Sequence, residues 1–403
     1  MSAQGSRRGL VITGGRVVTP FRVLEPGMVT IREGKIIAVE KGARQIGDEE
    51  QCSELVEGKV INAEGLTVAP GLIDIHVHGG VGHDTMDATS EAIGAMARFF
   101  ACHGVTSFLP TTMTAGREET LAAIENVARC MEKGGDGAEI LGVHLEGPYL
   151  SQEKKGAQPP SYIRPADPEE YRAFFQAGPV RLITVAPEIQ RNRELILFAV
   201  EHGAAVAVGH SAATYEEVLE AVSLGLSQAT HTFNGMGGLH HRRPGTVGAV
   251  LSCDDIYAQV IVDFLHIHPA VVKLLVRAKG PERTVLITDA IRAAGMPDGT
   301  YDLGGQEVTV KGGEARLSTG TLAGSTLTMD RAVRNVMEAA ELSLPETLRM
   351  ATVTPADSIG IADRKGSLER GKDADIILLD EELQVVLTMV GGEVVYRAEE
   401  RVV

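Results

Sequence analysis

The chain has 403 residues, of which 54 are acidic and 38 are basic, so its formal net charge is −16. A chain of this length can bury a large hydrophobic core and is expected to contain more than one domain. The acidic balance argues against a nucleic-acid-binding surface. No apolar run approaches the roughly 20 residues that a membrane-spanning helix needs.

Cysteine usage and the N-terminal residues bear on location. Cys52, Cys102, Cys130 and Cys253 are far apart and form no CxxC pair. This pattern is typical of a reducing compartment and argues against a disulfide framework or a cysteine-type zinc site. The N-terminal residues MSAQGSRRGLVITGG lack the apolar region of a signal peptide. We therefore expect a cytoplasmic protein with no membrane partner.

Both ends of the chain carry short β-like runs with glycine-containing turns. These runs lie within residues 10–62 and 374–396. The simplest assembly pairs them into one small β-sandwich domain, made of residues 1–66 and 368–403.

The central region, residues 67–367, repeats a pattern in which a short apolar run is followed by a helix-like segment. Eight runs are predicted as strands: Leu72–Val77, Val105–Pro110, Ile140–Leu145, Val180–Ala186, Ala204–Gly209, Ser227–Thr232, Ile256–Val262 and Thr284–Thr288. Helical patterns include Ser90–Cys102, Glu118–Met131, Asn192–His202, Tyr215–Leu224 and Pro269–Ala278. Alternating strands and helices predict a parallel sheet, and eight such units predict an α/β fold of the (β/α)8, TIM-like barrel type.

Two further segments follow the eighth strand. A β-like insert covers residues 304–318, and a helical stretch covers residues 326–353. The helical stretch is expected to complete the outer ring of the barrel.

The first predicted barrel strand contains the sequence GLIDIHVHGG. Because alternate residues of a strand point to one face, Asp74, His76 and His78 are expected to share a face. A polar strand end facing water and a metal site both fit this stretch when it is considered alone.

Other predicted strands end in similar groups. His144 and Glu146 end the third strand, His210 the fifth, His231 the sixth and Asp289 the eighth. A single histidine at a strand end is more often a hydrogen-bonded polar residue than a ligand. A barrel, however, brings all its strand ends to one face, and imidazoles and carboxylates that converge are suited to a divalent cation. The repetition favours a metal site.

Asp289 is the lone carboxylate on the last predicted strand. A divalent cation lowers the pKa of a water molecule, so that hydroxide is available near neutral pH. Asp289 could accept the proton from that water and pass it to a leaving group. The alternative is that Asp289 caps the segment that follows it.

A basic cluster, GLHHRRPG, lies at residues 238–245 after the sixth strand. Arginine is suited to bidentate recognition of phosphate or carboxylate. A solvated charged loop explains the same residues equally well.

Several longer motifs occur in one order along nearly the whole chain. They are APGLIDIHVHGG, GVHLEGPYL, VGHS, THTFNGM, HHRRPG, VLITDA and GTLAGSTLTMDRAVRN. The first is a signal at the level of a superfamily, and the set is far more specific. Together they resemble the amidohydrolase superfamily and, more narrowly, its family of N-acetylglucosamine-6-phosphate deacetylases.

The resemblance implies a role for each matching residue. Glu146, His210 and His231 match the main metal ligands, and His76 and His78 match a pair that holds a second metal in some members, with Glu146 bridging. One or two divalent ions, zinc or iron, are thus implied, and Asp289 matches the catalytic acid/base. The implied substrate contacts are Asn234, Gly235, Arg242, His266, Gln158 and Gly147.

The resemblance also implies a substrate and an assembly. The substrate is N-acetyl-D-glucosamine 6-phosphate, which is hydrolysed to D-glucosamine 6-phosphate and acetate in amino-sugar catabolism or recycling. A homodimer is implied, in which the neighbouring subunit completes the phosphate site. The alternatives are the N-acetylgalactosamine 6-phosphate epimer, another amidohydrolase reaction on a cyclic amide or a deaminase substrate, and a non-catalytic scaffold.

Two positions depart from the family pattern. Gln158 stands where a loop histidine is usual, and a glutamine can donate a hydrogen bond but cannot carry a proton. Gly235 stands where alanine is more usual. The second change is expected to be mild, because the implied contact is made by the backbone.

Overall fold

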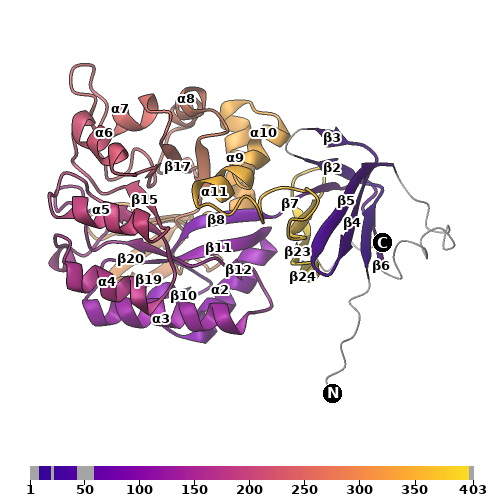
Figure 1. Cartoon of the computed structure of the whole chain (residues 1–403), viewed down its shortest axis with the longest axis horizontal. Helices are drawn as coiled ribbons and strands as arrows, with labels where there is room; N and C mark the ends of the chain where they lie inside the picture. The colour runs from indigo at the N-terminus through magenta and orange to yellow at the C-terminus, as the bar shows by residue number, and fades with distance from the viewer. Residues whose placement is uncertain (1–8, 20–21, 43–58, 399–403) are drawn as a thin grey trace.

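The computed structural model describes residues 9–19, 22–42 and 59–398, which form two bodies that lie side by side (Figure 1). The larger body is a parallel barrel ringed by helices, and the smaller is a pair of packed β-sheets. The parts of the sandwich prediction at residues 1–8, 20–21, 43–58 and 399–403 lie outside the described residues. No helix among the described residues is long and apolar enough to cross a membrane.

Eight parallel strands form the barrel, which confirms the predicted fold. They are β8 (Leu72–Val77), β11 (Val105–Thr112), β13 (Val143–Glu146), β14 (Val180–Val185), β15 (Ala205–Val208), β16 (Gln228–Ala229), β17 (Tyr257–Ile261) and β18 (Thr284–Ile287). Each pairs with the next in this order. Nearly every residue of these strands is buried, as expected for a parallel sheet covered by helices.

Hydrogen bonds to the Asp74 carboxylate help to close the barrel between its first and last strands. Its carboxylate accepts bonds from the Thr288 hydroxyl at 2.5 Å and the Thr288 amide at 3.4 Å. The Asp289 amide also donates to the carbonyl of His76 at 2.9 Å. Burial raises the pKa of Asp74 to about 6, although the bonds from Thr288 counter this effect. Asp74 therefore joins β8 to β18.

Two predicted strands differ most in extent from the observed ones, and the other ends agree to within two residues. The predicted strand Ile140–Leu145 is divided into β12 (Glu139–Ile140) and β13. Gly142 lies between them with φ +142°, a conformation that L side chains rarely adopt, so the ladder is interrupted there. The sixth strand is only two residues long, because the backbone leaves the ladder at His231, where φ is +31°.

The helices cover the outside of the barrel (Figure 1). They are α2 (Ser90–Cys102), α3 (Arg117–Lys133), α4 (Pro168–Ala177), α5 (Asn192–Glu201), α6 (Tyr215–Ser223), α7 (Gly245–Ser252), α8 (Pro269–Lys279), α9 (Met329–Ala340), α10 (Leu344–Arg349) and α11 (Val353–Ser358). The Thr89 side chain caps α2 by accepting a bond from the Ala92 amide. That helix then buries Ile93, Met96 and Phe100 against the barrel at helical spacing.

Two sheets form the smaller body. One has the order β5 (Lys35–Lys41), β4 (Gly27–Arg32), β1 (Leu10–Thr13) and β6 (Lys59–Asn62). The other has the order β24 (Glu393–Arg397), β23 (Val385–Val390), β22 (Ile376–Leu379), β7 (Thr67–Pro70), β2 (Arg16–Val18) and β3 (Val23–Leu24). Ile12 and Val29 from the first sheet share one buried core with Ile376 and Met389 from the second. Both ends of the chain thus build a small sandwich, as predicted.

The predicted insert is a three-stranded antiparallel sheet. Its strands are β19 (Gly299–Leu303), β20 (Gln306–Lys311) and β21 (Glu314–Leu317). Leu303, Val308 and Leu317 share an apolar cluster with Met113, which directly follows β11. The insert is therefore packed over the strand ends on one side of the barrel.

We propose a domain division close to that expected from the sequence, with one boundary moved. The strand β7 pairs with β2 and β22 and so belongs to the sandwich. The barrel domain then starts after Pro70 and runs to residue 367.

A buried ion cluster links the barrel to the chain that returns to the sandwich. The side chain of Lys365 is only 1% exposed, and its ammonium contacts three carboxylates: Glu139 at 2.7 Å, Asp373 at 3.4 Å, and Asp375. Glu139 lies on β12, whereas Asp373 and Asp375 precede β22. The Arg364 guanidinium also contacts Glu139 and Asp373, each at 2.8 Å, and the Lys35 ammonium contacts Asp373. Because three basic side chains balance the three carboxylates, we assign the cluster a structural role.

Replacing Lys365 with Met is expected to lower the free energy of unfolding by about 3–5 kcal/mol, because the buried carboxylate of Asp375 loses its cation. Equilibrium unfolding in urea measures the change. Lys35→Met is the matched control. The Lys35 ammonium lies 2.6 Å from Asp373, but its side chain is 48% exposed, so its loss should cost less than about 1 kcal/mol. Equal losses in the two variants would contradict the structural role of Lys365.

Candidate active site

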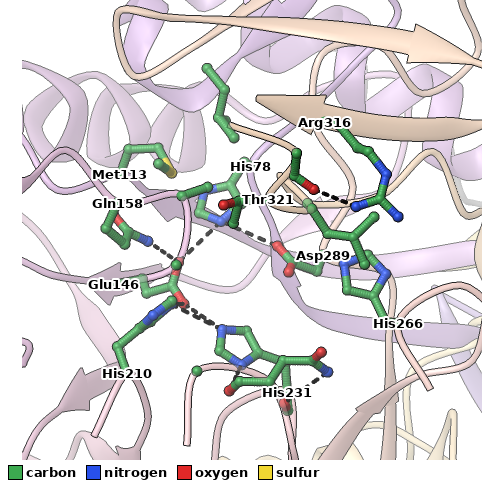
Figure 2. A pocket seen from close by; sticks show the side chains of 18 residues that line it. His78, Met113, Glu146, Gln158, His210, His231, His266, Asp289, Arg316 and Thr321 are labelled. Carbon is green, nitrogen blue, oxygen red and sulfur yellow. Dashed lines mark hydrogen bonds and ion pairs between the residues drawn. The ribbon is translucent and has the colours of Figure 1, made fainter. Parts of the chain in front are cut away.

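The predicted metal ligands and the predicted acid/base meet at one end of the barrel, and all of them except His76 are drawn in Figure 2. His76 lies on β8 and His78 directly follows that strand, while Glu146 ends β13. His210, His231 and Asp289 follow β15, β16 and β18. All six side chains are buried. The carboxyl ends of parallel strands therefore converge on one point, as the barrel topology requires.

The Glu146 carboxylate is the centre of this cluster. Its Oε1 lies 3.1 Å from Nε2 of His231 and 3.3 Å from Nε2 of His210. The two imidazole Nε2 atoms are 3.1 Å apart. These three side chains form one group whose donor atoms are close enough to hold a metal ion.

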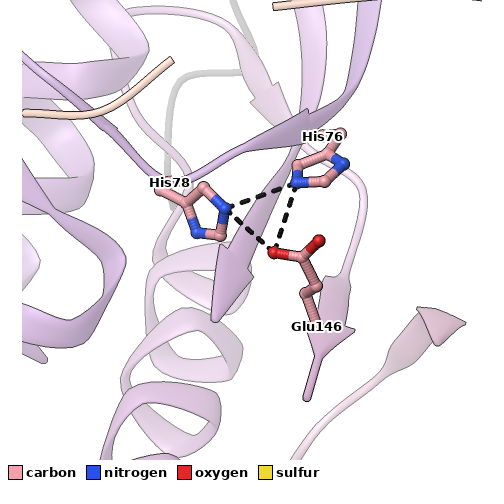
Figure 3. Close-up of side chains that lie close together, drawn as sticks. All are labelled: His76, His78 and Glu146. Atoms are coloured by element: carbon pink, nitrogen blue, oxygen red, sulfur yellow. Dashed lines mark hydrogen bonds and ion pairs between the residues drawn. The ribbon is translucent and has the colours of Figure 1, made fainter. Parts of the chain in front are cut away.

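The other oxygen of Glu146 faces the histidine pair of the first strand (Figure 3). Oε2 lies 3.1 Å from Nε2 of His78 and 3.6 Å from Nε2 of His76. Oδ1 of Asp289 lies 3.3 Å and 3.4 Å from the same two nitrogens. Glu146, His76 and His78 form a second group that could hold an ion, so one carboxylate is shared by two groups.

Three of the converging residues have an unusual backbone conformation. The φ angles of His210, His231 and Asp289 are +46°, +31° and +50°. Non-glycine residues rarely adopt positive φ, and such strain persists where the surrounding structure enforces it, often at functional sites. The strain accompanies a sharp turn at each strand end.

The Nδ1 atoms of these histidines have hydrogen-bond partners that indicate whether the Nε2 atoms can bind a metal. Nδ1 of His210 lies 2.9 Å from the carbonyl of Lys154. Nδ1 of His231 and of His78 each lie 3.2 Å from the carbonyls of Asn234 and Thr111, respectively. A carbonyl only accepts, so each Nδ1 carries a proton, and the neutral form of each ring directs its Nε2 lone pair into the site. These rings fit a divalent cation.

In the structure, the Nε2 atoms of these histidines lie beside carboxylate oxygens. Burial lowers the pKa of His78, but hydrogen bonds to Asp289 and Glu146 outweigh it and raise that pKa well above its usual range. Burial would raise the pKa of Asp289, yet His76 and His78 lower it. Binding of a cation at Nε2 of His78 must therefore displace a proton from that imidazole.

His144 does not join the cluster, although it is near Glu146 in sequence. Its Nε2 lies 2.8 Å from the Thr184 hydroxyl and its Nδ1 lies 3.3 Å from the Thr111 hydroxyl. Burial and the neighbouring His76 lower its pKa well below the usual value. His144 is thus a neutral core residue held by two threonines.

Gln158, which stands where a histidine is usual, contacts the shared carboxylate. Its side-chain amide donates to Oε2 of Glu146 at 2.9 Å. Its carbonyl accepts from the Thr114 amide, also at 2.9 Å. Gln158 therefore orients Glu146 through a neutral hydrogen bond.

A cavity of about 380 Å³ opens above the cluster. Asn234 and Gly235, two of the residues implied as substrate contacts, line it. Gly235 has φ +61°, and a Cβ atom there would lie 2.9 Å from Nδ1 of His210. An alanine at this position would press on that imidazole, so the exchange is less mild than we expected from the sequence.

His266 also lines the cavity and is held by a neighbouring acid. Its Nδ1 lies 2.7 Å from Oδ2 of Asp263, whose other oxygen accepts bonds from the Leu265 and His266 amides, each at 2.9 Å. Burial lowers the pKa of His266, but the bond to Asp263 raises it above its usual value. Asp263 thus fixes the direction in which Nε2 points.

Two predicted substrate contacts do not line the cavity. Arg242 is exposed, and its guanidinium contacts His241 at 2.8 Å. Gly147 instead packs against Thr114, and its φ of +81° requires a residue without a side chain.

Sequence reasoning missed Arg316, Thr321, Met113 and Leu303, which line the cavity. Arg316 lies on β21 and Leu303 ends β19, so the insert supplies part of the wall. In Figure 2, Arg316 and His266 lie across Asp289 from Gln158 and Met113. The insert was recognisable as β structure, but no local motif signals that it faces the site.

Comparisons with known proteins agree with this architecture. Residues 67–395 match the amidohydrolase family. The N-acetylglucosamine-6-phosphate deacetylase of Bacillus subtilis (strain 168) is 37% identical over 396 residues, which cover 97% of this chain and 98% of that protein. The N-acetylgalactosamine-6-phosphate deacetylase of Escherichia coli O157:H7 is 37% identical over 385 residues, with coverages of 95% and 98%.

A solved structure is similar over nearly its full length. It is a mutant of the N-acetyl-D-glucosamine-6-phosphate deacetylase of Mycobacterium smegmatis in complex with N-acetyl-D-glucosamine-6-phosphate. The TM-score is 0.88 at 34% identity, with 96% of this chain and 99% of the other covered. The chain therefore belongs to the amidohydrolase family, and these relatives within it are hexosamine-phosphate deacetylases.

Proposed function

We propose that this protein is a metal-dependent hydrolase that removes the acetyl group from N-acetyl-D-glucosamine 6-phosphate. Water and the acetamide are converted to acetate and D-glucosamine 6-phosphate. The observation that carries this proposal is the convergence of four histidines and Asp289 around one shared glutamate, Glu146, beside the cavity. Relatives that cover almost the whole chain are deacetylases of this kind.

The metal site is proposed from the two donor groups. Glu146, His210 and His231 would hold the first divalent cation, and His76 and His78, together with Glu146, would hold a second and weaker one. Imidazole and carboxylate donors suit zinc or iron. When bound, the cation lowers the pKa of a water molecule and polarises the amide carbonyl.

Asp289 carries the proton in this proposal. Its Oδ1 lies within 3.4 Å of both first-strand imidazoles and borders the cavity, so it is close to any water held at the cluster. Asp289 accepts the proton as the water oxygen attacks the carbonyl carbon. It returns the proton to the nitrogen as the carbon–nitrogen bond breaks, which releases a neutral amine.

The remote part of the substrate is proposed to bind Asn234, Gly235, His266 and Arg242. Arg242 is exposed and does not line the cavity of its own subunit. This position supports a homodimer in which Arg242 of each subunit contacts the phosphate bound in the other subunit. Remote binding energy of this kind orients the amide for attack.

Because sugar phosphates are charged and do not cross membranes unaided, we also propose a cytoplasmic location.

Arg242→Ala is expected to raise KM about 10- to 100-fold, since a hydrogen bond to a charged group contributes about 1.5–3 kcal/mol.

Subunit mixing tests whether two subunits share one site. When Arg242→Ala and Asp289→Asn subunits are mixed in equal amounts, half the dimers contain one subunit of each kind. In each of these dimers, one site combines Asp289 of one subunit with Arg242 of the other. Activity at low substrate should then recover to about one quarter of the unmutated enzyme. No recovery would contradict donation of Arg242 by the partner subunit.

The galacto epimer is the second candidate, because the Escherichia coli relative is named for it. Acetate release from N-acetylglucosamine 6-phosphate, N-acetylgalactosamine 6-phosphate and unphosphorylated N-acetylglucosamine separates these possibilities. We expect the highest kcat/KM for the first. A higher value for the second would favour the alternative, and equal values with and without phosphate would contradict a phosphate site.

A further inference from the structure

One side of the cavity is apolar and was not implicated by the sequence. We name Met113, Ala157 and Leu303 the acyl wall. All three line the cavity, and Met113 and Leu303 are each 2% exposed. Both belong to the buried cluster between the barrel and the insert, and Ala157 packs against that cluster. The acyl wall therefore has a rigid backing.

Hydrogen bonds tie the acyl wall to the reacting centre. The Thr114 amide donates to Gln158, and Gln158 donates to Oε2 of Glu146, each at 2.9 Å. Met113 precedes Thr114, so it is two hydrogen bonds away from the shared carboxylate. In Figure 2, Met113 and Gln158 lie on the same side of Glu146, away from Arg316 and His266.

The insert closes against the same residues. A Cβ atom on Gly304, next to Leu303, would lie 3.4 Å from the terminal methyl carbon of Met113. The side chain of Gln306 donates to the Ala157 carbonyl at 2.6 Å, which joins the insert to the loop that carries Ala157 and Gln158. The three members of the acyl wall thus come from three segments that are held together.

We infer that the acyl wall receives the methyl group of the acetyl substrate and limits the length of the acyl chain that the enzyme accepts. This inference rests on the proposed function. The methyl is bonded directly to the attacked carbonyl carbon, so it must lie beside the cluster, where apolar surface favours it. Hydroxyl and phosphate groups suit the polar residues across the cavity. Because the wall is backed by packed core, it resists displacement by extra methylenes.

The test compares N-acetyl-, N-propionyl- and N-butyrylglucosamine 6-phosphate. In the unmutated enzyme, kcat/KM should fall at least about tenfold for each added methylene. Met113→Ala and Leu303→Ala should each raise the ratio of N-butyryl to N-acetyl kcat/KM at least about tenfold. A ratio measured on one preparation is independent of the fraction of folded enzyme, so partial unfolding does not obscure the result.

Leu322→Ala is the matched control. Leu322 also lines the cavity but bridges to Arg316, on the side away from the acyl wall, so its variant should keep the unmutated ratio. Ala157→Val narrows the wall and should lower activity on the N-acetyl substrate more than on the N-formyl substrate.

Unchanged ratios in both wall variants, or an equal shift in Leu322→Ala, would overturn the inference while leaving the proposed function intact. An enzyme that is inactive on every N-acylated hexosamine 6-phosphate would contradict the proposed function, and the acyl wall with it.

Discussion

Asp289→Asn is expected to reduce kcat by about 10³-fold or more while metal content and substrate affinity stay close to those of the unmutated enzyme. Asparagine keeps the shape of the side chain but cannot accept the proton of the attacking water or return it to the amine. General acid–base groups typically contribute about 10²- to 10⁴-fold, and here one group serves both steps. Steady-state kinetics, metal analysis and substrate titration on one preparation separate these effects.

Asp136→Asn is the control for this substitution. Asp136 pairs with Arg98 at 3.1 Å on the surface, and its side chain is 75% exposed, so this variant should keep full activity. If Asp289→Asn retained kcat within a few-fold of the unmutated enzyme, Asp289 would not be the proton carrier.

Glu146→Gln is expected to remove both metal ions and, with them, activity. The two oxygens of Glu146 face different pairs of histidines, so neutralising this one carboxylate weakens both donor groups. The His76→Ala, His78→Ala double variant should lose only the second and weaker ion. Metal analysis after dialysis against buffer with and without added zinc distinguishes these two patterns.

Two outcomes would contradict this assignment. Retention of a full complement of metal by Glu146→Gln would show that the shared carboxylate is not a ligand. Loss of all metal from the His76, His78 double variant would reverse the proposed order of affinity.

The barrel could be predicted from the sequence because most of its strands are short apolar runs, such as Ala205–Val208, separated by helical patterns. The limits of the strands could not. Gly142 interrupts one predicted strand, and the turn at His231 shortens another, because positive φ angles break the ladder at both places. Both features depend on the tertiary surroundings of those residues.

The cluster was predictable for a topological reason, and the remaining cavity was not. Once eight parallel strands are recognised, Glu146, His210 and Asp289 must meet, because the carboxyl ends of barrel strands share one face. Arg316 and Leu303 reach the cavity only because the insert folds back over the barrel. Nothing in the local pattern of β19 or β21 indicates that packing, which depends on the buried cluster shared with Met113.

The exposed Arg242 marks another limit. Residues 238–245 suggested an anion-binding segment, but Arg242 does not line the cavity of its own subunit. A role that depends on a neighbouring subunit cannot be found from strand patterns, which describe one chain only.

A metal titration of the chelated enzyme tests the central claim most directly. Zn²⁺ or Fe²⁺ is added in increments to metal-free protein, and bound metal and acetate release from N-acetylglucosamine 6-phosphate are measured on the same samples. We predict negligible activity without metal, and activity that rises with the first bound ion per subunit, while a second ion binds more weakly. Full activity in metal-free protein, or metal bound with no acetate released, would contradict the account.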